Sequence, residues 1–178
     1  MTGHFGATYE SVQVRHYRHA RTECVRSCSQ DSAAWIDGML EGTGGKEAEL
    51  VEKMKGAAGA HTSFTKLCQS AKACDRHLYG LSQMLIPKEK CDMMSYPLYK
   101  KSGTWEISTS NVSNDFYEGF GFGQVCSYGI GCGYIIKADK IIYNCTTRRD
   151  KSDGSPEKMC EILTEVLNEM KALVEASQ

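Results

Sequence analysis

The sequence has almost no net charge and no long apolar run, and these two absences exclude several classes of protein. Its 178 residues carry a formal net charge of −1, which argues against a general binder of nucleic acids or other polyanions. No apolar stretch approaches the ~20 residues that a helix needs to span a bilayer. Internal repeats and low-complexity segments are also lacking, so we expect one ordinary folded unit.

The N-terminal residues lack the basic and apolar regions of a secretory signal peptide. We therefore expect the nine cysteines to be reduced thiols inside a cell, since their number is odd and they are scattered along the chain. Cys24 and Cys28 could form half of a zinc site, but we favour two small buried residues one turn apart on a helix. We predict no metal site and no permanently bound cofactor.

Hydrophobic periodicity predicts a mixed α/β structure, with helices in the first half and strands after them. The glycine-rich stretch 42–45 separates the first two helices, and Pro87 ends the third. Asp31 or Ser32 is the expected cap of the first helix. The expected helices are 29–40, 46–58, 60–85 and 156–176, and the expected strands are 11–17, 104–110, 129–136 and 140–147. We predict that these strands form a mixed sheet, flanked by helices and completed by other sequence.

Several short motifs follow one another in a definite order. They are Thr-Tyr-Glu-Ser at 8–11, Arg-Thr at 21–22 with Val-Arg-Ser at 25–27, Asp-Arg-His-Leu at 75–78, Trp-x-Ile-Ser-Thr-Ser at 105–110 and Phe-Gly-x-Val at 122–125. Each is commonplace by itself. In this order and at these separations, followed by a glycine-rich turn into a strand and by a final helix, they resemble the carnitine/choline acyltransferases. The resemblance covers residues 8–173.

The family that this pattern resembles works in fatty-acid metabolism. It transfers acyl groups reversibly between the thiol of coenzyme A and the hydroxyl of carnitine or choline. Its fold has two similar α/β lobes of the coenzyme A-dependent acyltransferase type, with the active site in a tunnel between them. The resemblance implies that residues 1–178 are the C-terminal portion of such a domain, mostly its second lobe. Carnitine and acyl-coenzyme A would be the substrates, and the N-terminal lobe would be the missing partner.

One arginine on the third expected helix is the central candidate for substrate binding. Arg76 matches the family's carboxylate-binding arginine, and Tyr9 and Thr22 match its hydroxyl-bearing partners. A planar guanidinium offers parallel donors that fit a carboxylate, which carnitine has and choline lacks. Family members that use choline carry uncharged or apolar residues at the positions of Arg76 and Thr22, so the resemblance favours carnitine. The alternative is a surface arginine paired with Asp75 or a nearby glutamate.

Ser110 is the candidate that would act on the transition state. It matches the family's oxyanion-stabilising hydroxyl, and a fixed donor aimed at the developing oxyanion lowers the barrier of thioester attack. Alternation along a strand places Ser108 and Ser110 on one face, with Thr109 on the other. The alternative is a solvated strand face with no catalytic role. The family continues with glutamine where this chain has Asn111, so a contact made by the longer amide is not expected.

The aromatic stretch 119–125 supplies the remaining predicted contacts. Phe122 matches the aromatic residue beside the trimethylammonium group, which an aromatic face attracts, and Val125 lines the same region. Phe120 occupies the position where glycine leaves room for a long acyl chain, so we expect a short-chain, acetyl-type preference. Gln124 replaces the usual proline. A phosphate-binding loop is the alternative for these glycines, but strand sequence follows where such a loop would open a helix.

No histidine of this sequence matches the context of the family's general base. In the family that base lies upstream of the segment that resembles residues 8–11, as do the lysines that bind the phosphates of coenzyme A. We therefore expect a fragment or truncated form of a longer enzyme, inactive by itself and with exposed apolar surface. A catalytically inactive carnitine-binding or regulatory relative is the alternative. Short-chain members work in mitochondria or peroxisomes, and we expect the mitochondrial matrix here.

Overall fold

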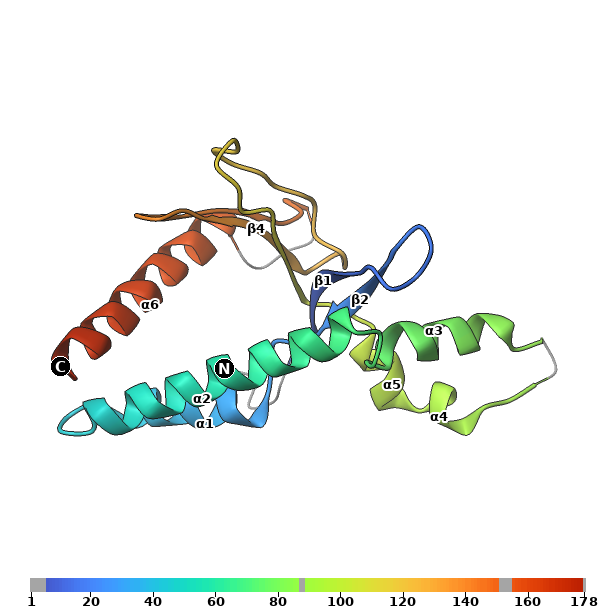
Figure 1. The fold of residues 1–178 in the computed structure, drawn as a ribbon, viewed down its shortest axis with the longest axis horizontal. Coiled ribbons are helices and arrows are strands. Elements are labelled where there is room, and N and C mark those ends of the chain that lie inside the picture. The colour runs from blue at the N-terminus through green and yellow to red at the C-terminus, as the bar shows by residue number, and fades with distance from the viewer. Residues whose placement is uncertain (1–5, 87–88, 151–154, 178) are drawn as a thin grey trace.

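The computed structural model describes residues 6–86, 89–150 and 155–177, which form helices around one five-stranded mixed sheet (Figure 1). The strands are β1 (Thr8–Val14), β2 (Arg21–Val25), β3 (Ile107–Asn111), β4 (Ile130–Ile136) and β5 (Ile141–Thr146). The helices are α1 (Gln30–Glu41), α2 (Glu47–Gln69), α3 (Asp75–Met84), α4 (Asp92–Ser95), α5 (Pro97–Ser102) and α6 (Pro156–Ala176). A mixed sheet flanked by helices is the fold class that the sequence predicted.

The sheet has the strand order β2-β1-β3-β4-β5. The two outer pairs, β1–β2 and β4–β5, are antiparallel, whereas β3 runs parallel to both of its neighbours. One row of the register joins Tyr9, Ser108, Gly131 and Thr146 across four strands, and the next row joins Glu10, Thr109, Cys132 and Cys145. Because side chains alternate along a strand, these rows lie on opposite faces of the sheet.

The helices cover the sheet unevenly. α2 lies beside α1, and its C-terminal end packs against β1 and β2 (Figure 1). α6 packs against β5 at its start and against α2 near its end, so it lies at an angle to α2 in Figure 1. α3, α4 and α5 project beyond the β2 edge of the sheet (Figure 1). The first residues of α3 are thereby brought to the edge strand.

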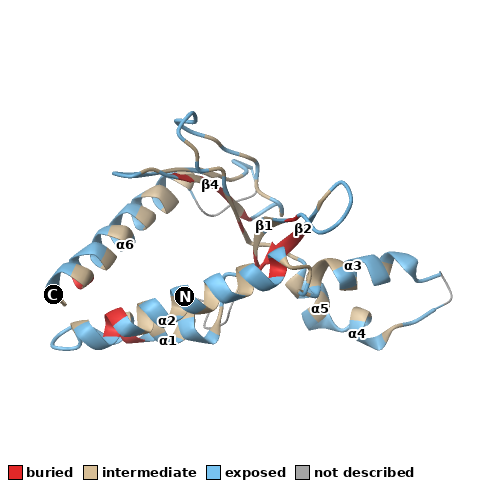
Figure 2. Cartoon of the chain, viewed as in Figure 1, coloured by how far each residue is buried: buried red, intermediate tan, exposed pale blue. Residues whose placement is uncertain are grey.

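Burial is concentrated in three places, shown in red in Figure 2; one is β4, where Ile135 is 0% and Cys132 7% exposed, and the other two join helices to each other and to the sheet. Leu50 and Val51 of α2 pack with Leu173 of α6 at one end of the molecule. Cys24 of β2 and Cys68 of α2 are fully buried where the helix meets the sheet, and the Cys68 thiol lies 3.6 Å from the carbonyl oxygen of Cys24. This second contact fixes the end of α2, and with it the turn that leads into α3.

Several large apolar side chains are exposed, as the sequence led us to expect. Met84 is 78% exposed, Leu98 65% and Phe116 93%. Exposed apolar surface of this kind is typical of a unit that packs against other protein. Among the described helices, none combines the length and the apolar character needed to cross a bilayer.

The helix boundaries between residues 46 and 85 differ from the prediction. The predicted break near residue 59 is absent, because α2 continues through Gly56 and Gly59. Packing of α2 against α1 at one end and the sheet at the other outweighs the ~1 kcal/mol that each glycine costs in a helix. The break comes instead at Ala71, whose φ of 59° is left-handed. α3 therefore starts at Asp75, and Arg76 lies in its first turn. Pro87, the predicted helix end, is outside the described residues.

Three further local predictions were wrong. The first strand, predicted over 11–17, is β1 at Thr8–Val14, and a turn follows it. Ser29, and not Asp31 or Ser32, is the N-cap of α1; its side chain accepts a hydrogen bond from the backbone N–H of Ser32. Cys24 and Cys28 do not share a helix, because Cys24 lies in β2 and Cys28 is exposed in the following loop. Within the described residues no cluster of three or more His, Cys, Asp or Glu side chains is placed to hold a metal ion.

Candidate functional site

Arg76 lies against two aromatic rings at the junction of α3 and the sheet. Its Nη2 donates a hydrogen bond of 3.2 Å to the hydroxyl of Tyr9. Its guanidinium carbon lies 5.5 Å from the ring centroid of Tyr9 and 5.6 Å from that of Trp105. The two rings are themselves stacked, with centroids 4.3 Å apart. Cation–π attraction and the hydrogen bond together hold the guanidinium at the sheet.

The positive charge of Arg76 has no neutralising carboxylate within the part of the chain that the structure describes. Among the described residues, no carboxylate lies within 4.0 Å of its guanidinium. The alternative pairing with Asp75 is wrong, because the Asp75 carboxylate faces Arg26, with a closest distance of 2.5 Å. A half-buried guanidinium without a carboxylate partner among these residues has the charge and geometry to bind an anionic group.

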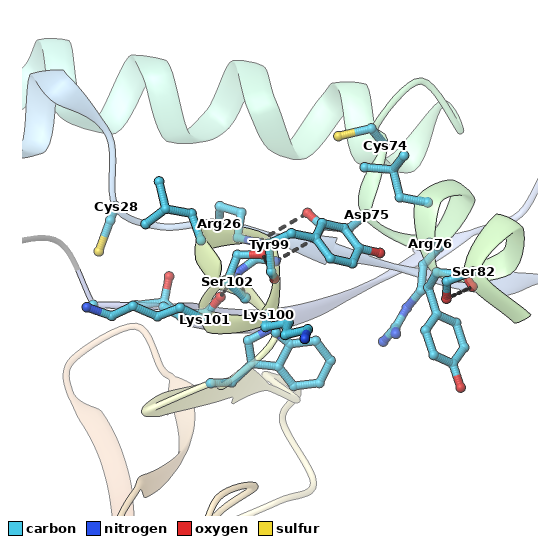
Figure 3. Close-up of a pocket in the computed structure, with 18 residues that line it drawn as sticks. Arg26, Cys28, Cys74, Asp75, Arg76, Ser82, Tyr99, Lys100, Lys101 and Ser102 are labelled. Atoms are coloured by element: carbon cyan, nitrogen blue, oxygen red, sulfur yellow. Dashed lines mark hydrogen bonds and ion pairs between the residues drawn. The ribbon is translucent and has the colours of Figure 1, made fainter. Parts of the chain in front are cut away.

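Two cavities flank Arg76. The larger, of about 1110 Å³, lies between α3, α5 and the start of β1, and Trp105 lines it together with Arg76 (Figure 3). The smaller, of about 670 Å³, lies between β2, the turn after α2 and α3, and Thr22 and His77 line it together with Arg76. The structure therefore brings the three predicted contacts to the carnitine carboxylate, Tyr9, Thr22 and Arg76, to one region. Tyr9 touches Arg76 directly, whereas Thr22 shares only a cavity with it.

Ser110 lies on the same sheet face as Tyr9. Ser108 is the register partner of Tyr9, and Ser110 is two residues further along β3. Thr109 points to the other face, where its hydroxyl donates a 2.6 Å hydrogen bond to Glu10. The predicted alternation is therefore confirmed. The Ser110 hydroxyl forms no hydrogen bond to any of the described residues, so it is available as a donor in this structure.

The segment containing Phe120 and Phe122 covers this face of the sheet. A Cβ atom on Gly133, the register partner of Ser110, would lie 2.9 Å from the Phe120 ring, so the ring rests directly on the glycine. The carbonyl oxygen of Phe122 accepts a hydrogen bond from the hydroxyl of Thr146, at 2.5 Å. The two phenylalanine rings are 5.9 Å apart. Phe120 is thus placed over the register partner of Ser110, with the Phe122 ring beside it.

Two predictions about the same segment have different outcomes. No helix follows the glycines at 119–123, and β4 is the next element, so a helix-opening phosphate loop is excluded there. Val125 is 51% exposed and lines neither cavity, so its placement beside the ligand stays a prediction.

The opposite face of the sheet carries a polar network that the sequence did not reveal. The Glu10 carboxylate accepts hydrogen bonds from Thr109 and, at 2.9 Å, from the hydroxyl of Tyr134. Burial, reinforced by the negative charge of Glu10, raises the pKa of Tyr134 to about 12. This network ties β1, β3 and β4 together behind the candidate site. Its members are 99 and 124 residues apart, which is why no local pattern marks them.

The chain is an α/β protein in which a guanidinium and two aromatic rings form a site where α3 meets β1. On the same sheet face lies the Ser110 hydroxyl, which has no hydrogen-bond partner among the described residues. A sequence model described as choline/carnitine O-acyltransferase matches residues 1–165. The chain belongs to the choline/carnitine O-acyltransferase family.

Individual relatives show how much of such proteins this chain represents. It is 30% identical to the mitochondrial carnitine O-acetyltransferase of Saccharomyces cerevisiae over 92% of this chain and 24% of that protein. It is 30% identical to the human peroxisomal carnitine O-octanoyltransferase over 98% of this chain and 29% of that protein. The choline O-acetyltransferase of Danio rerio is 28% identical over 96% and 27%, respectively. The chain thus spans about a quarter of the length of these relatives.

Proposed function

We propose that this chain forms the carnitine-binding portion of a carnitine O-acyltransferase. The reaction would be reversible transfer of an acyl group between coenzyme A and the carnitine hydroxyl, with both molecules as substrates and no permanently bound cofactor. The observation that carries the proposal is the unpaired guanidinium of Arg76, held by Tyr9 and Trp105 beside two cavities. In the proposal it binds the carnitine carboxylate, assisted by the hydroxyls of Tyr9 and Thr22.

The charge of Arg76 supports carnitine over choline, although both kinds of enzyme occur among the relatives. A hydrogen bond to a charged group contributes about 1.5–3 kcal/mol, which corresponds to an affinity ratio of about 10- to 100-fold. Choline has no carboxylate, and its trimethylammonium group would be repelled by the guanidinium. Phe122 and Val125 would supply the apolar and aromatic contacts for that ammonium group in carnitine.

Ser110 would supply the oxyanion-stabilising hydroxyl. Attack of the carnitine hydroxyl on the thioester places negative charge on the carbonyl oxygen, and a fixed donor stabilises that charge. The hydroxyl proton must go to a general base, and we assign that role to a histidine outside residues 1–178. Collapse of the tetrahedral intermediate breaks the carbon–sulfur bond, and the proton held by that base is returned to the coenzyme A sulfur, which leaves as the thiol.

The Phe120 ring supports a preference for short acyl groups. It lies on Gly133, the register partner of Ser110, and in the proposal it occupies space into which a long acyl chain would extend. A short acyl group such as acetyl needs none of this space. In cells we propose a mitochondrial location, which one relative's name supports and another's, a peroxisomal enzyme, leaves open.

A coenzyme A release assay tests the proposal. The protein made from the complete coding sequence that contains residues 1–178 is incubated with acetyl-coenzyme A and either carnitine or choline. We expect carnitine-dependent release of the thiol by that protein, and no turnover by residues 1–178 alone. Higher kcat/KM for choline would contradict the substrate assignment. Carnitine binding without any turnover by the complete protein would instead indicate an inactive, carnitine-binding relative.

A further inference from the structure

A bidentate salt bridge joins the edge of the sheet to the first residue of α3. Arg26 follows β2 directly, and its Nη2 and Nε atoms lie 2.5 Å and 3.2 Å from the two oxygens of Asp75. The side chains are only 24% and 26% exposed, which places the pair in the wall of the larger cavity (Figure 3). Paired donors of this kind fix orientation as well as distance. Asp75 is the immediate neighbour of Arg76.

The same arginine also anchors two other segments. Its Nη1 donates a hydrogen bond of 2.6 Å to the carbonyl oxygen of Ser102, at the end of α5, and lies 3.5 Å from the carbonyl oxygen of Thr8, at the start of β1. Arg26 therefore holds α3, α5 and β1 at one point. The hydrogen bond to Asp75 raises the pKa of Arg26 further above its ordinary value, so the guanidinium stays charged.

A second carboxylate from β2 holds the next residue of α3. Glu23 is buried, with 4% of its surface exposed. Its Oε1 accepts hydrogen bonds from the backbone N–H of Arg76, at 3.0 Å, and from that of Cys24, at 2.8 Å. The N-cap residue of α3, Cys74, makes no side-chain capping bond. Glu23 thus satisfies a backbone donor that the helix itself leaves free.

We propose that Arg26, Asp75 and Glu23 are positioning residues for Arg76. They fix the first turn of α3 through two consecutive residues, and this turn sets where the guanidinium meets Tyr9. A displacement of about 1 Å in a ligand-binding group is enough to weaken function by orders of magnitude. The inference deepens the proposed function, on which it rests for the identity of the ligand. The claim that these residues order the first turn of α3 does not depend on the proposed function.

The test uses substitutions that keep the side chain close to its original size and remove one hydrogen bond or one charge. Asp75→Asn and Arg26→Lys are compared with Asp150→Asn and Arg148→Lys in the complete protein. The control pair, Arg148 and Asp150, is also bidentate, with nitrogen–oxygen distances of 3.0 and 2.8 Å. It is exposed and lies in the turn after β5. Glu23→Gln keeps an acceptor oxygen, whereas Glu23→Leu removes it. KM for carnitine, KM for acetyl-coenzyme A and amide hydrogen exchange at residues 75–78 are measured for each variant.

We expect Asp75→Asn, Arg26→Lys and Glu23→Leu to raise KM for carnitine about tenfold, with KM for acetyl-coenzyme A changed less than about twofold. Exchange at residues 75–78 should accelerate in the same variants. Glu23→Gln and both control variants should stay close to the parent protein. Equal rises in both KM values, or unchanged carnitine KM with unchanged exchange, would overturn the inference.

A protein without carnitine-dependent activity would defeat the proposed function and leave exchange as the decisive measurement. Faster exchange in the three variants but not in the controls would then support the positioning role. Unchanged exchange would overturn it. Should Asp75→Asn fail to fold, Arg26→Lys and the Glu23 pair decide the question by the same readouts.

Discussion

The ring of Phe120 rests on Gly133, and this contact puts an aromatic side chain over the strand position that pairs with Ser110. A Cβ atom at position 133 would lie 2.8 Å from the Phe120 carbonyl oxygen and 2.9 Å from a ring carbon, both closer than real contacts allow. Gly133 is the register partner of Ser110 on the neighbouring strand. Because Gly133 has no side chain, the Phe120 ring can pack against β4 at the position paired with the candidate catalytic residue.

Substituting Phe120→Gly should shift the acyl preference toward longer chains. The vacated volume would admit further methylenes, each of which contributes about 0.8 kcal/mol when buried. We expect the ratio of kcat/KM for octanoyl- over acetyl-coenzyme A to rise about tenfold or more. Phe116→Gly is the matched control, because Phe116 is the same residue type four positions earlier and is 93% exposed. A parent protein that already prefers palmitoyl- over acetyl-coenzyme A would refute the short-chain proposal.

Substituting Arg76→Asn should raise KM for carnitine with little change in KM for acyl-coenzyme A. The loss of a charged donor that binds a carboxylate costs about 1.5–3 kcal/mol, or about 10- to 100-fold. Steady-state kinetics with each substrate varied in turn measures the effect. Arg148→Asn removes an exposed guanidinium far along the chain and should leave both KM values unchanged. A rise confined to the coenzyme A KM would show that Arg76 serves the other substrate.

Substituting Ser110→Ala should lower kcat while leaving both KM values nearly unchanged. Loss of one oxyanion donor costs about 2.7–4 kcal/mol, or about 10²–10³-fold in kcat. The Ser110 side chain makes no hydrogen bond within the described residues, so the stability of the fold should not change. Ser127→Ala, at an exposed position, serves as the control. Full activity in Ser110→Ala would assign the oxyanion donor to another group.

The fold should lose stability above pH 9 because of its buried thiols. Burial raises the pKa of Cys24 from its ordinary 9.0 to about 12 and that of Cys68 to about 11. The unfolded chain therefore releases these protons first, and stability that is fully present below pH 9 is lost as the pH rises toward the folded-state values. Each group contributes a slope of up to about 1.4 kcal/mol per pH unit.

Urea unfolding between pH 8 and 11 measures this dependence. Cys24→Ala should reduce the steepness of the decline, although it lowers stability at every pH by leaving a small void. Cys28→Ala changes an exposed thiol and should leave the slope as it is. An identical slope in Cys24→Ala would show that other groups cause the alkaline loss.

Local patterns and family motifs in the sequence predicted much of this structure. Strands β4 and β5 and helix α6 were predicted within one or two residues, because alternation and helical spacing are strong in these segments. The grouping of Tyr9 and Arg76, 67 residues apart, followed from the family resemblance, and the structure places them in contact. The shared face of Ser108 and Ser110 followed from strand geometry.

The mixed α/β class and the candidate site residues follow from the amino-acid sequence alone. The orientation of α3 does not, because its anchors come from β2. Arg26 lies 49 residues from Asp75, and Glu23 lies 53 residues from the backbone N–H it accepts. Hydrophobic spacing predicted a helix over residues 60–85, whereas in the structure α2 ends at Gln69 and Ala71 is left-handed before α3 begins. Long-range contacts of this kind leave no periodic pattern in the sequence, because the tertiary fold, and not the neighbouring residues, determines which side chains meet.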